Sequence, residues 1–212
     1  GITMPAGRRS RLLHWAYAAP DRYIIEDDYD SELRYFGKPV PALKSLDENN
    51  CVIYLGSFSS TLFPAVKISY MVLPKDMAEI FNDIKGAYTQ TCSKSEQLTL
   101  ALFMEKGYYY TGIRKLRSMN SRKLDLTLDA FSKYFGKEVT PMDTRSGITL
   151  TIKVRSGRSI AELILLAKTI GLEMVPISAI TDQSTSALSF YYSQIPLDLI
   201  DAKIKELEGI WR

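Results

Sequence analysis

YIIEDDYDSELRY (residues 23–35) and GSFSSTLFPAVKISYMVLP (residues 56–74) are the two stretches of this sequence that decide its fold. The first opens with a short apolar run, Tyr23–Ile25, that ends in acids. Similar runs at 51–55 and 68–73 are followed by Gly56 and Pro74. Short apolar runs bounded by turn residues are typical of buried parallel strands. The sequence therefore predicts an α/β fold, with functional side chains just beyond the carboxyl ends of these strands.

Four carboxylates crowd into residues 26–30, EDDYD, directly after the first predicted strand. Such crowding is repulsive unless a cation or a hydrogen-bonding ligand lies among the acids. A solvated loop explains the same residues without any ligand and is the simpler interpretation from the residues alone. A divalent metal is a further alternative, although no histidine lies nearby and one cluster of carboxylates does not by itself identify an oxygen-only site.

The segment Ser57-Phe58-Ser59-Ser60-Thr61 follows the second predicted strand, and Lys67 comes shortly after it. Hydroxyls and backbone N–H groups at a strand-to-helix turn, together with a cation, suit a phosphate monoester. Turns rich in Ser and Thr also occur without a ligand. The residues alone therefore leave a phosphate site and a plain turn as alternatives.

Beyond Pro74 the pattern becomes helical. Ser93 and Glu96 have the spacing of a capping box for a helix that Gly107 would end. A 3–4 apolar stripe then predicts a long helix that stops at Gly136. Because a new pattern follows, we expect a domain boundary near residue 119, with a large-domain part at 1–118 and a small α/β domain at 119–212.

Within the small domain, alternation at 148–154 predicts a half-buried strand. Ser159 and Glu162 predict a capped helix that ends at Gly171. Further strands are expected at Leu172–Ile177 and at 187–192, and a last helix is expected from about residue 196.

Composition restricts the class of protein. The formal charge is +3, without a basic stretch interleaved with aromatic residues, so the chain itself does not predict a DNA-reading surface. The basic residues 114–123 are expected to form a solvated helix face. Cys51 and Cys92 are expected to be small core residues in a reducing compartment. With no apolar run of membrane-spanning length and no signal peptide, we expect a cytoplasmic protein.

The two opening stretches resemble the effector domain of MocR/GabR-type transcription regulators of the GntR superfamily. EDDYDSE and ISYMVLP are strings of that family, and MPAGRR near the start also matches it. The resemblance covers most of the chain and is strongest over its first half. It implies the fold of pyridoxal-phosphate enzymes of fold type I, with a partial large domain, a mostly parallel sheet and a small C-terminal α/β domain.

The same resemblance implies a role for each of six residues in binding pyridoxal 5′-phosphate. Asp27 would pair with the pyridinium nitrogen, Tyr29 would donate to the ring oxygen, and Ser57 and Ser59 would bind the phosphate. Lys67 stands where the family has a phosphate-binding Arg, and Ser60 where it has the Schiff-base lysine. No catalytic residue and no metal ligand are implied.

Two departures from the family bear on function. Ser60 has no amine, so pyridoxal 5′-phosphate would be held noncovalently at most, and the lysine that moves protons in transaminases is missing. Between Arg158 and Arg212 there is no Arg for an amino-acid carboxylate, and Gln194 is expected to replace the family's late Arg.

The resemblance therefore implies a noncatalytic, effector-sensing and dimerising domain of a transcription regulator. Its partners would be a second copy, a small-molecule effector and, through an upstream winged-helix domain outside this chain, DNA. No membrane partner is expected. Two alternatives stay open: an aminotransferase that uses another amine, such as Lys67, and a structural dimerisation module without a ligand.

Overall fold

The computed structural model describes residues 4–29, 31–35, 40–62, 66–142, 147–177 and 186–212. The described residues divide into two compact units. The N-terminal unit comprises residues of 4–32 and 40–114, and the C-terminal unit comprises 33–35 and residues of 115–212. The domain limits expected from the sequence, 1–118 and 119–212, stay a prediction.

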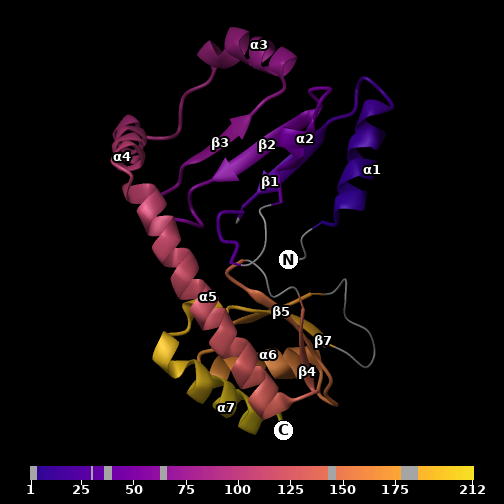
Figure 1. The fold of residues 1–212 in the computed structure, drawn as a ribbon, viewed down its shortest axis with the longest axis vertical. Helices are drawn as coiled ribbons and strands as arrows, with labels where there is room; N and C mark the ends of the chain where they lie inside the picture. Colours follow the sequence, from indigo (N-terminus) through magenta and orange to yellow (C-terminus); the bar gives the residue numbers. More distant parts are fainter. Residues whose placement is uncertain (1–3, 30, 36–39, 63–65, 143–146, 178–185) are drawn as a thin grey trace. The chain divides into compact units, whose positions relative to one another are not determined.

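The N-terminal unit carries a three-stranded sheet and several helices (Figure 1). Its elements are α1 (Ala6–Tyr17), β1 (Ile24–Asp28), α2 (Leu43–Leu46), β2 (Val52–Ser57), β3 (Ser69–Val72), α3 (Lys75–Ile84), a 3-10 turn (Lys85–Ala87), α4 (Lys94–Glu105) and the start of α5 (Tyr108–Phe135).

The strand order is β1-β2-β3, with β1 parallel and β3 antiparallel to β2. The prediction that 68–73 forms a buried parallel strand is therefore wrong, and all four β3 residues are exposed. The backbone N–H of Phe58 donates to the carbonyl of Ile68 (3.0 Å), so the chain turns straight back after β2. Antiparallel neighbours need only a turn, whereas parallel neighbours need a longer crossover. This direction brings the start of β3 to the edge where β1 and β2 end.

One face of the β1–β2 pair is packed and the other is open. Leu13 and Ala16 of α1 and Leu43 of α2 bury Ile24 and Val52. On the opposite face the exposed fraction of Ile25 is 67% and that of Met71 is 50%. Large apolar side chains on an open sheet face are unusual for a surface that faces water only.

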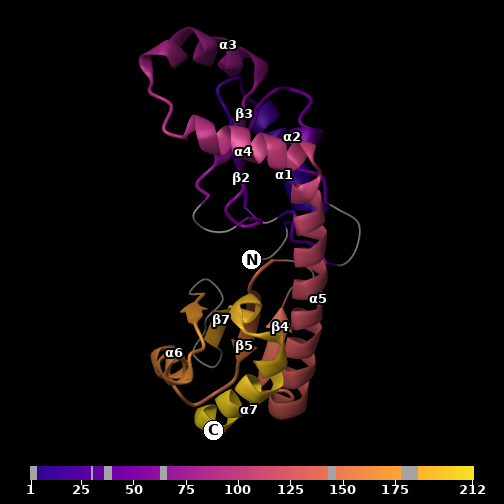
Figure 2. The ribbon, with the colours of Figure 1, turned by 90° about the vertical axis from the view of Figure 1, so that its left-hand side faces the viewer.

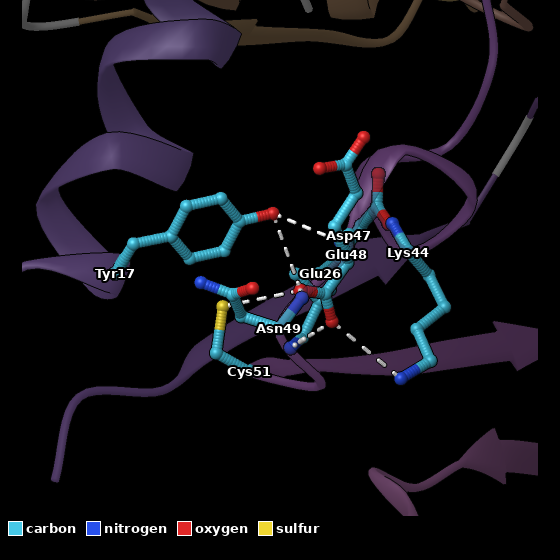
Figure 3. A network of polar contacts seen from close by, with 8 residues as sticks. Tyr17, Glu26, Lys44, Asp47, Glu48, Asn49 and Cys51 are labelled. Carbon is cyan, nitrogen blue, oxygen red and sulfur yellow. Dashed lines mark hydrogen bonds and ion pairs between the residues drawn. The ribbon is translucent and has the colours of Figure 1, made fainter. Parts of the chain in front are cut away.

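Asp47 ties the end of α2 to the start of β2 (Figure 3). Its carboxylate accepts hydrogen bonds from the backbone N–H groups of Val52 (2.8 Å) and Asn49 (3.2 Å) and from the Cys51 thiol (3.3 Å). Burial raises the pKa of the Asp47 carboxyl, but these donors, with the Cys51 N–H, outweigh burial and hold it below its usual range. Burial beside Asp47 raises the pKa of the Cys51 thiol to about 11.

The C-terminal unit contains a four-stranded antiparallel sheet of order β4-β5-β7-β6. Its elements are the rest of α5, β4 (Val139–Met142), β5 (Leu150–Val154), α6 (Ile160–Thr169), β6 (Met174–Pro176), β7 (Ser186–Phe190), two 3-10 turns (Tyr192–Gln194 and Leu197–Leu199) and α7 (Ile200–Trp211). Figures 1 and 2 show α6 beside α7, where the Trp211 indole donates to the Leu163 carbonyl (3.0 Å).

The helix ends agree with the local sequence pattern at some positions and differ from it at others. The capping box of Ser159 and Glu162 is confirmed at the start of α6. The box predicted at Ser93 is wrong: Ser93 precedes α4, but its hydroxyl lies 2.7 Å from the Ser95 hydroxyl and caps no backbone group. Figure 2 shows α5 as one continuous helix, and it ends before Gly136, whose φ is +55°.

The strands of the C-terminal unit depart from prediction at two points. Val139–Met142 forms β4, a strand that was not predicted from the sequence. The predicted half-buried strand at 148–154 is β5, but Thr151 on its expected polar face has an exposed fraction of only 5%. Among the described residues, no helix combines the length and apolar character that a bilayer span requires.

Candidate functional site

Glu26, Asp27 and Asp28 belong to β1 itself, not to the segment after it as the sequence predicted, and their side chains are divided between the two faces of the sheet. Successive side chains of a strand point to opposite faces, so Glu26 and Asp28 share the face that α1 and α2 cover. The Glu26 carboxylate accepts hydrogen bonds from the backbone N–H groups of Leu43 (2.6 Å) and Lys44 (2.9 Å), at the start of α2. Glu26 therefore holds α2 in place and is not free to bind a ligand.

Asp28 also has a structural partner on that face. The Tyr54 hydroxyl donates to its carboxylate (2.8 Å). Burial raises the pKa of the Tyr54 hydroxyl above its usual range, and the Asp28 carboxylate raises it further, so this tyrosine stays a neutral donor. The crowding of the acids is thus relieved by dividing them between faces.

Asp27 lies on the open face. In the sheet register it stands opposite Leu55 on β2. Asp27, Leu55, Ser57, Ser69 and Met71 line a hollow of about 320 Å³ at this face, together with Gly56 and Tyr70. The carboxylate is exposed and, among the described residues, has no recorded hydrogen bond or ion pair. It is therefore available to a cationic or N–H donor group of a ligand.

The turn after β2 is shaped by its own serines. The Ser57 hydroxyl accepts from the backbone N–H of Ser59 (3.2 Å), and the Ser59 hydroxyl donates to the Val66 carbonyl (3.2 Å). The N–H of Leu62 closes the turn on the Phe58 carbonyl (2.9 Å). These bonds hold Ser57 and Ser59 at one end of the sheet, beside the end of β1.

Lys67 is brought to the same end. Its neighbours Val66 and Ile68 accept hydrogen bonds from Ser59 and Phe58, so Lys67 lies opposite Ser59. The side chain is exposed, and no described acid forms an ion pair with it. A cation without a partner beside two hydroxyls is a suitable environment for a phosphate or another anion.

Ser60 joins this turn to the residue after β1. Its hydroxyl donates a hydrogen bond of 2.6 Å to the backbone carbonyl of Tyr29. The Tyr29 side chain has an exposed fraction of 49%. The structure thus brings all six residues singled out by the sequence to one region: Asp27, Tyr29, Ser57, Ser59, Ser60 and Lys67.

Aromatic side chains support the turn from one side. The ring of Phe58 packs against Tyr70 (5.4 Å between centroids) and edge-on against Tyr109 (5.6 Å). The Tyr109 hydroxyl lies 3.0 Å from that of Thr61. This role of Tyr109 was not predicted from the sequence. The signal was available, because Tyr109 lies four residues before Ile113 and so continues its buried helical stripe.

Three sequence predictions outside this region are corrected. Lys123 is not on a solvated face: it is 8% exposed, and its ammonium donates to the Ser193 carbonyl (2.6 Å). Cys92 is partly exposed and not a core residue. The strand expected at 187–192 ends at Phe190, and Gln194 lies on the 3-10 turn that follows it.

The donor and acceptor groups define what the region can bind. Lys67 and the serine hydroxyls suit an anion, and Asp27 suits a protonated ring nitrogen or another cationic donor. Among the described residues, no group of three or more His, Cys, Asp or Glu side chains could hold a metal ion. The arrangement suits a small phosphorylated molecule with a basic ring.

No family model matches the chain. The HTH-type transcriptional regulator YdeL of Bacillus subtilis, whose function is uncharacterised, is 36% identical over 214 residues, which cover all of this chain and 46% of YdeL. "Probable rhizopine catabolism regulatory protein MocR" of Rhizobium meliloti is 33% identical over 153 residues, or 72% of this chain and 31% of that protein. The chain thus spans about half the length, or less, of these relatives.

Solved structures agree in fold. A kynurenine aminotransferase of Pyrococcus horikoshii, in complex with PMP, superimposes with a TM-score of 0.80 and 28% identity. The match covers 99% of this chain and 52% of that enzyme. The fold is therefore the fold of the aminotransferases of fold type I, as the sequence predicted.

Proposed function

Because this chain belongs to the MocR-type family of HTH transcriptional regulators, as an aminotransferase-like part, we propose that it senses an effector and supports dimerisation without catalysing transamination. The whole regulator would act in the cytoplasm and bind DNA through its HTH domain. Effector binding would shift the balance between two states of the dimer that differ in DNA affinity.

The observation that carries the proposal is Ser60. It lies beside Tyr29, to whose carbonyl its hydroxyl donates. Under the proposal, Ser60 stands at the position of the Schiff-base lysine and brings a hydroxyl where an enzyme of this fold needs an amine. A serine hydroxyl cannot form a Schiff base, nor can it act as the base that moves a proton from the substrate carbon.

The residues fit a noncovalently held pyridoxal or pyridoxamine phosphate. Asp27 would pair with the ring nitrogen, Tyr29 would donate to the ring oxygen, and Ser57, Ser59 and Lys67 would bind the phosphate. The related P. horikoshii enzyme is in complex with PMP, which supports this ligand class. When bound to an enzyme, such a group supplies an electron sink. Here it would serve as a ligand or as part of one.

An open apolar surface supports the dimerisation part of the proposal. None of the α3 residues is buried, and the exposed fractions of its Ile80 and Ile84 side chains are 61% and 45%. Tyr88, just beyond α3, has an exposed fraction of 68%. Surfaces of this kind are usually covered by another part of an assembly. The molar mass of the full-length protein in solution, measured by light scattering, should be that of a dimer.

Borohydride trapping tests the noncatalytic part. We expect the full-length protein to bind pyridoxal 5′-phosphate reversibly and, after reduction, to show no added mass on any peptide. The Ser60→Lys variant should become labelled at residue 60. A label on Lys67 of the wild-type protein would instead support the aminotransferase with a substitute amine. If neither protein binds the ligand, the pyridoxal-phosphate site is lost or incomplete, and the structural dimerisation module gains support.

A further inference from the structure

Ser60 has only one hydrogen to donate, and its partner is fixed. The Tyr29 carbonyl can only accept, so the 2.6 Å hydrogen bond commits the hydroxyl proton of Ser60 to Tyr29. What the Ser60 oxygen still offers is its lone pairs. Among the described residues, no donor to this oxygen is recorded.

The neighbouring groups have the same character. The Tyr29 carbonyl and the Asp27 carboxylate are acceptors as well. The side formed by Ser57, Ser59 and Lys67 offers a cation and the hydroxyl proton of Ser57, whereas the Ser59 hydroxyl donates to the Val66 carbonyl. A complementary ligand therefore carries an anion toward Lys67 and a hydrogen-bond donor toward Ser60.

We infer that the site selects the amine form of the ligand, pyridoxamine 5′-phosphate, over the aldehyde pyridoxal 5′-phosphate, because Ser60 presents an acceptor. This inference rests on the proposed function, in which Ser60 stands at the position of the lysine that bonds the 4′ carbon. An aminomethyl group donates to the Ser60 oxygen, whereas an aldehyde oxygen can only accept and would face lone pairs.

The Ser60 hydroxyl cannot donate to the aldehyde oxygen without losing its present hydrogen bond. Rotating its proton toward the ligand would remove the hydrogen bond to the Tyr29 carbonyl, so one bond is exchanged for another. The amine form gains a bond while keeping that one. A charge-assisted hydrogen bond of this kind corresponds to a preference of about tenfold or more.

Calorimetric titration of the full-length protein tests the inference with three probes: pyridoxamine, pyridoxal and pyridoxine 5′-phosphate. We expect pyridoxamine 5′-phosphate to bind about tenfold or more tightly than pyridoxal 5′-phosphate. The pyridoxine form, whose hydroxyl can donate or accept, should fall between them. Ser60→Ala should bring the amine and aldehyde forms to within about threefold of each other.

A matched control is Ser45→Ala. Ser45 also donates to a backbone carbonyl, that of Ala42 (2.7 Å), but it lies on α2. Its loss should leave the preference unchanged. Equal affinities in the wild-type protein, or a preference that survives Ser60→Ala in a protein of unchanged circular dichroism, would overturn the inference while leaving the proposed ligand class intact. Failure of all three probes to bind would overturn the proposed ligand class, and with it the inference.

Discussion

The hydroxyl of Tyr109, on the first turn of α5, lies 3.0 Å from the hydroxyl of Thr61, at the end of the turn that carries Ser57, Ser59 and Ser60. The same ring packs edge-on against Phe58. Helix α5 thus fixes one wall of the turn by a polar and an apolar contact. Neither contact involves a residue proposed to bind the ligand.

Replacing Tyr109 by Phe separates these two contacts, because the ring packing stays and the hydrogen bond is lost. We expect a loss of about 1 kcal/mol in the free energy of unfolding by urea. Ligand affinity should weaken a few-fold, since Ser57 and Ser59 lose part of their support. Tyr110→Phe is the control, because Tyr110 is 57% exposed and has no recorded hydrogen bond in the described chain. Equal effects of the two changes would contradict the prediction.

Gly56 makes room for the Tyr70 ring. A Cβ added at residue 56 would lie 2.3 Å from Cζ of Tyr70, so Gly56→Ala forces the ring away from its contacts with Phe58 and Tyr54. We expect a loss of about 1–3 kcal/mol in the free energy of unfolding.

A double-mutant cycle identifies the cause of that loss. In a Tyr70→Ala background the clash is gone, and Gly56→Ala should then be neutral or stabilising, since alanine restricts the unfolded chain more than glycine does. A loss of the same size in both backgrounds would show that Tyr70 is not responsible.

Asp47 should make stability depend on acid pH. Its pKa in the folded protein lies below its usual value, which is about 3.9 in an unfolded chain. The stabilisation by its carboxylate is therefore complete above about pH 4 and is lost as the pH falls through the lower, folded pKa.

Asp47→Asn should lower the free energy of unfolding by about 1–3 kcal/mol at pH 7, because the donors of Val52 and Asn49 lose a charged acceptor. The difference from the wild-type protein should shrink as the pH falls below 4. Urea unfolding between pH 7 and pH 3 measures this. Glu79→Gln, at an exposed position of α3, serves as the control and should follow the wild-type curve. Parallel curves for Asp47→Asn and the wild-type protein would refute the assignment.

The two cysteines should differ sharply in reactivity. Cys51 is 7% exposed and its thiol pKa is raised to about 11, so at pH 8 only about one thiol in a thousand is ionised. Cys92 is partly exposed. Iodoacetamide at pH 8 should label Cys92 first and Cys51 only after unfolding, as peptide mass spectrometry can show. Cys92→Ser should abolish the fast phase, and rapid labelling of Cys51 in the folded protein would contradict its burial.

Much of the fold could be predicted from local patterns. The apolar runs placed β1 and β2, and Gly107 and Gly136 correctly marked helix ends, since both adopt the positive φ that glycine tolerates. The capping box at Ser159 was recognisable because its hydrogen bonds join residues three apart. The same pattern failed at Ser93, where the neighbouring Ser95 hydroxyl is closer and takes the bond.

The candidate site shows what the sequence by itself determined and what only the tertiary structure decided. The sequence determined which functional groups are present, above all a hydroxyl at position 60 and an ammonium group at position 67, because the residue type fixes the chemistry of its side chain. It could not show that β3 runs antiparallel to β2, which brings Lys67 opposite Ser59. Nor could it show that Glu26 and Asp28 form hydrogen bonds on the packed face of the sheet, whereas the Asp27 side chain lines the hollow on the other face. The direction of a strand and the groups that pack on each face of a sheet depend on contacts between residues far apart in the chain. Local periodicity does not determine these contacts.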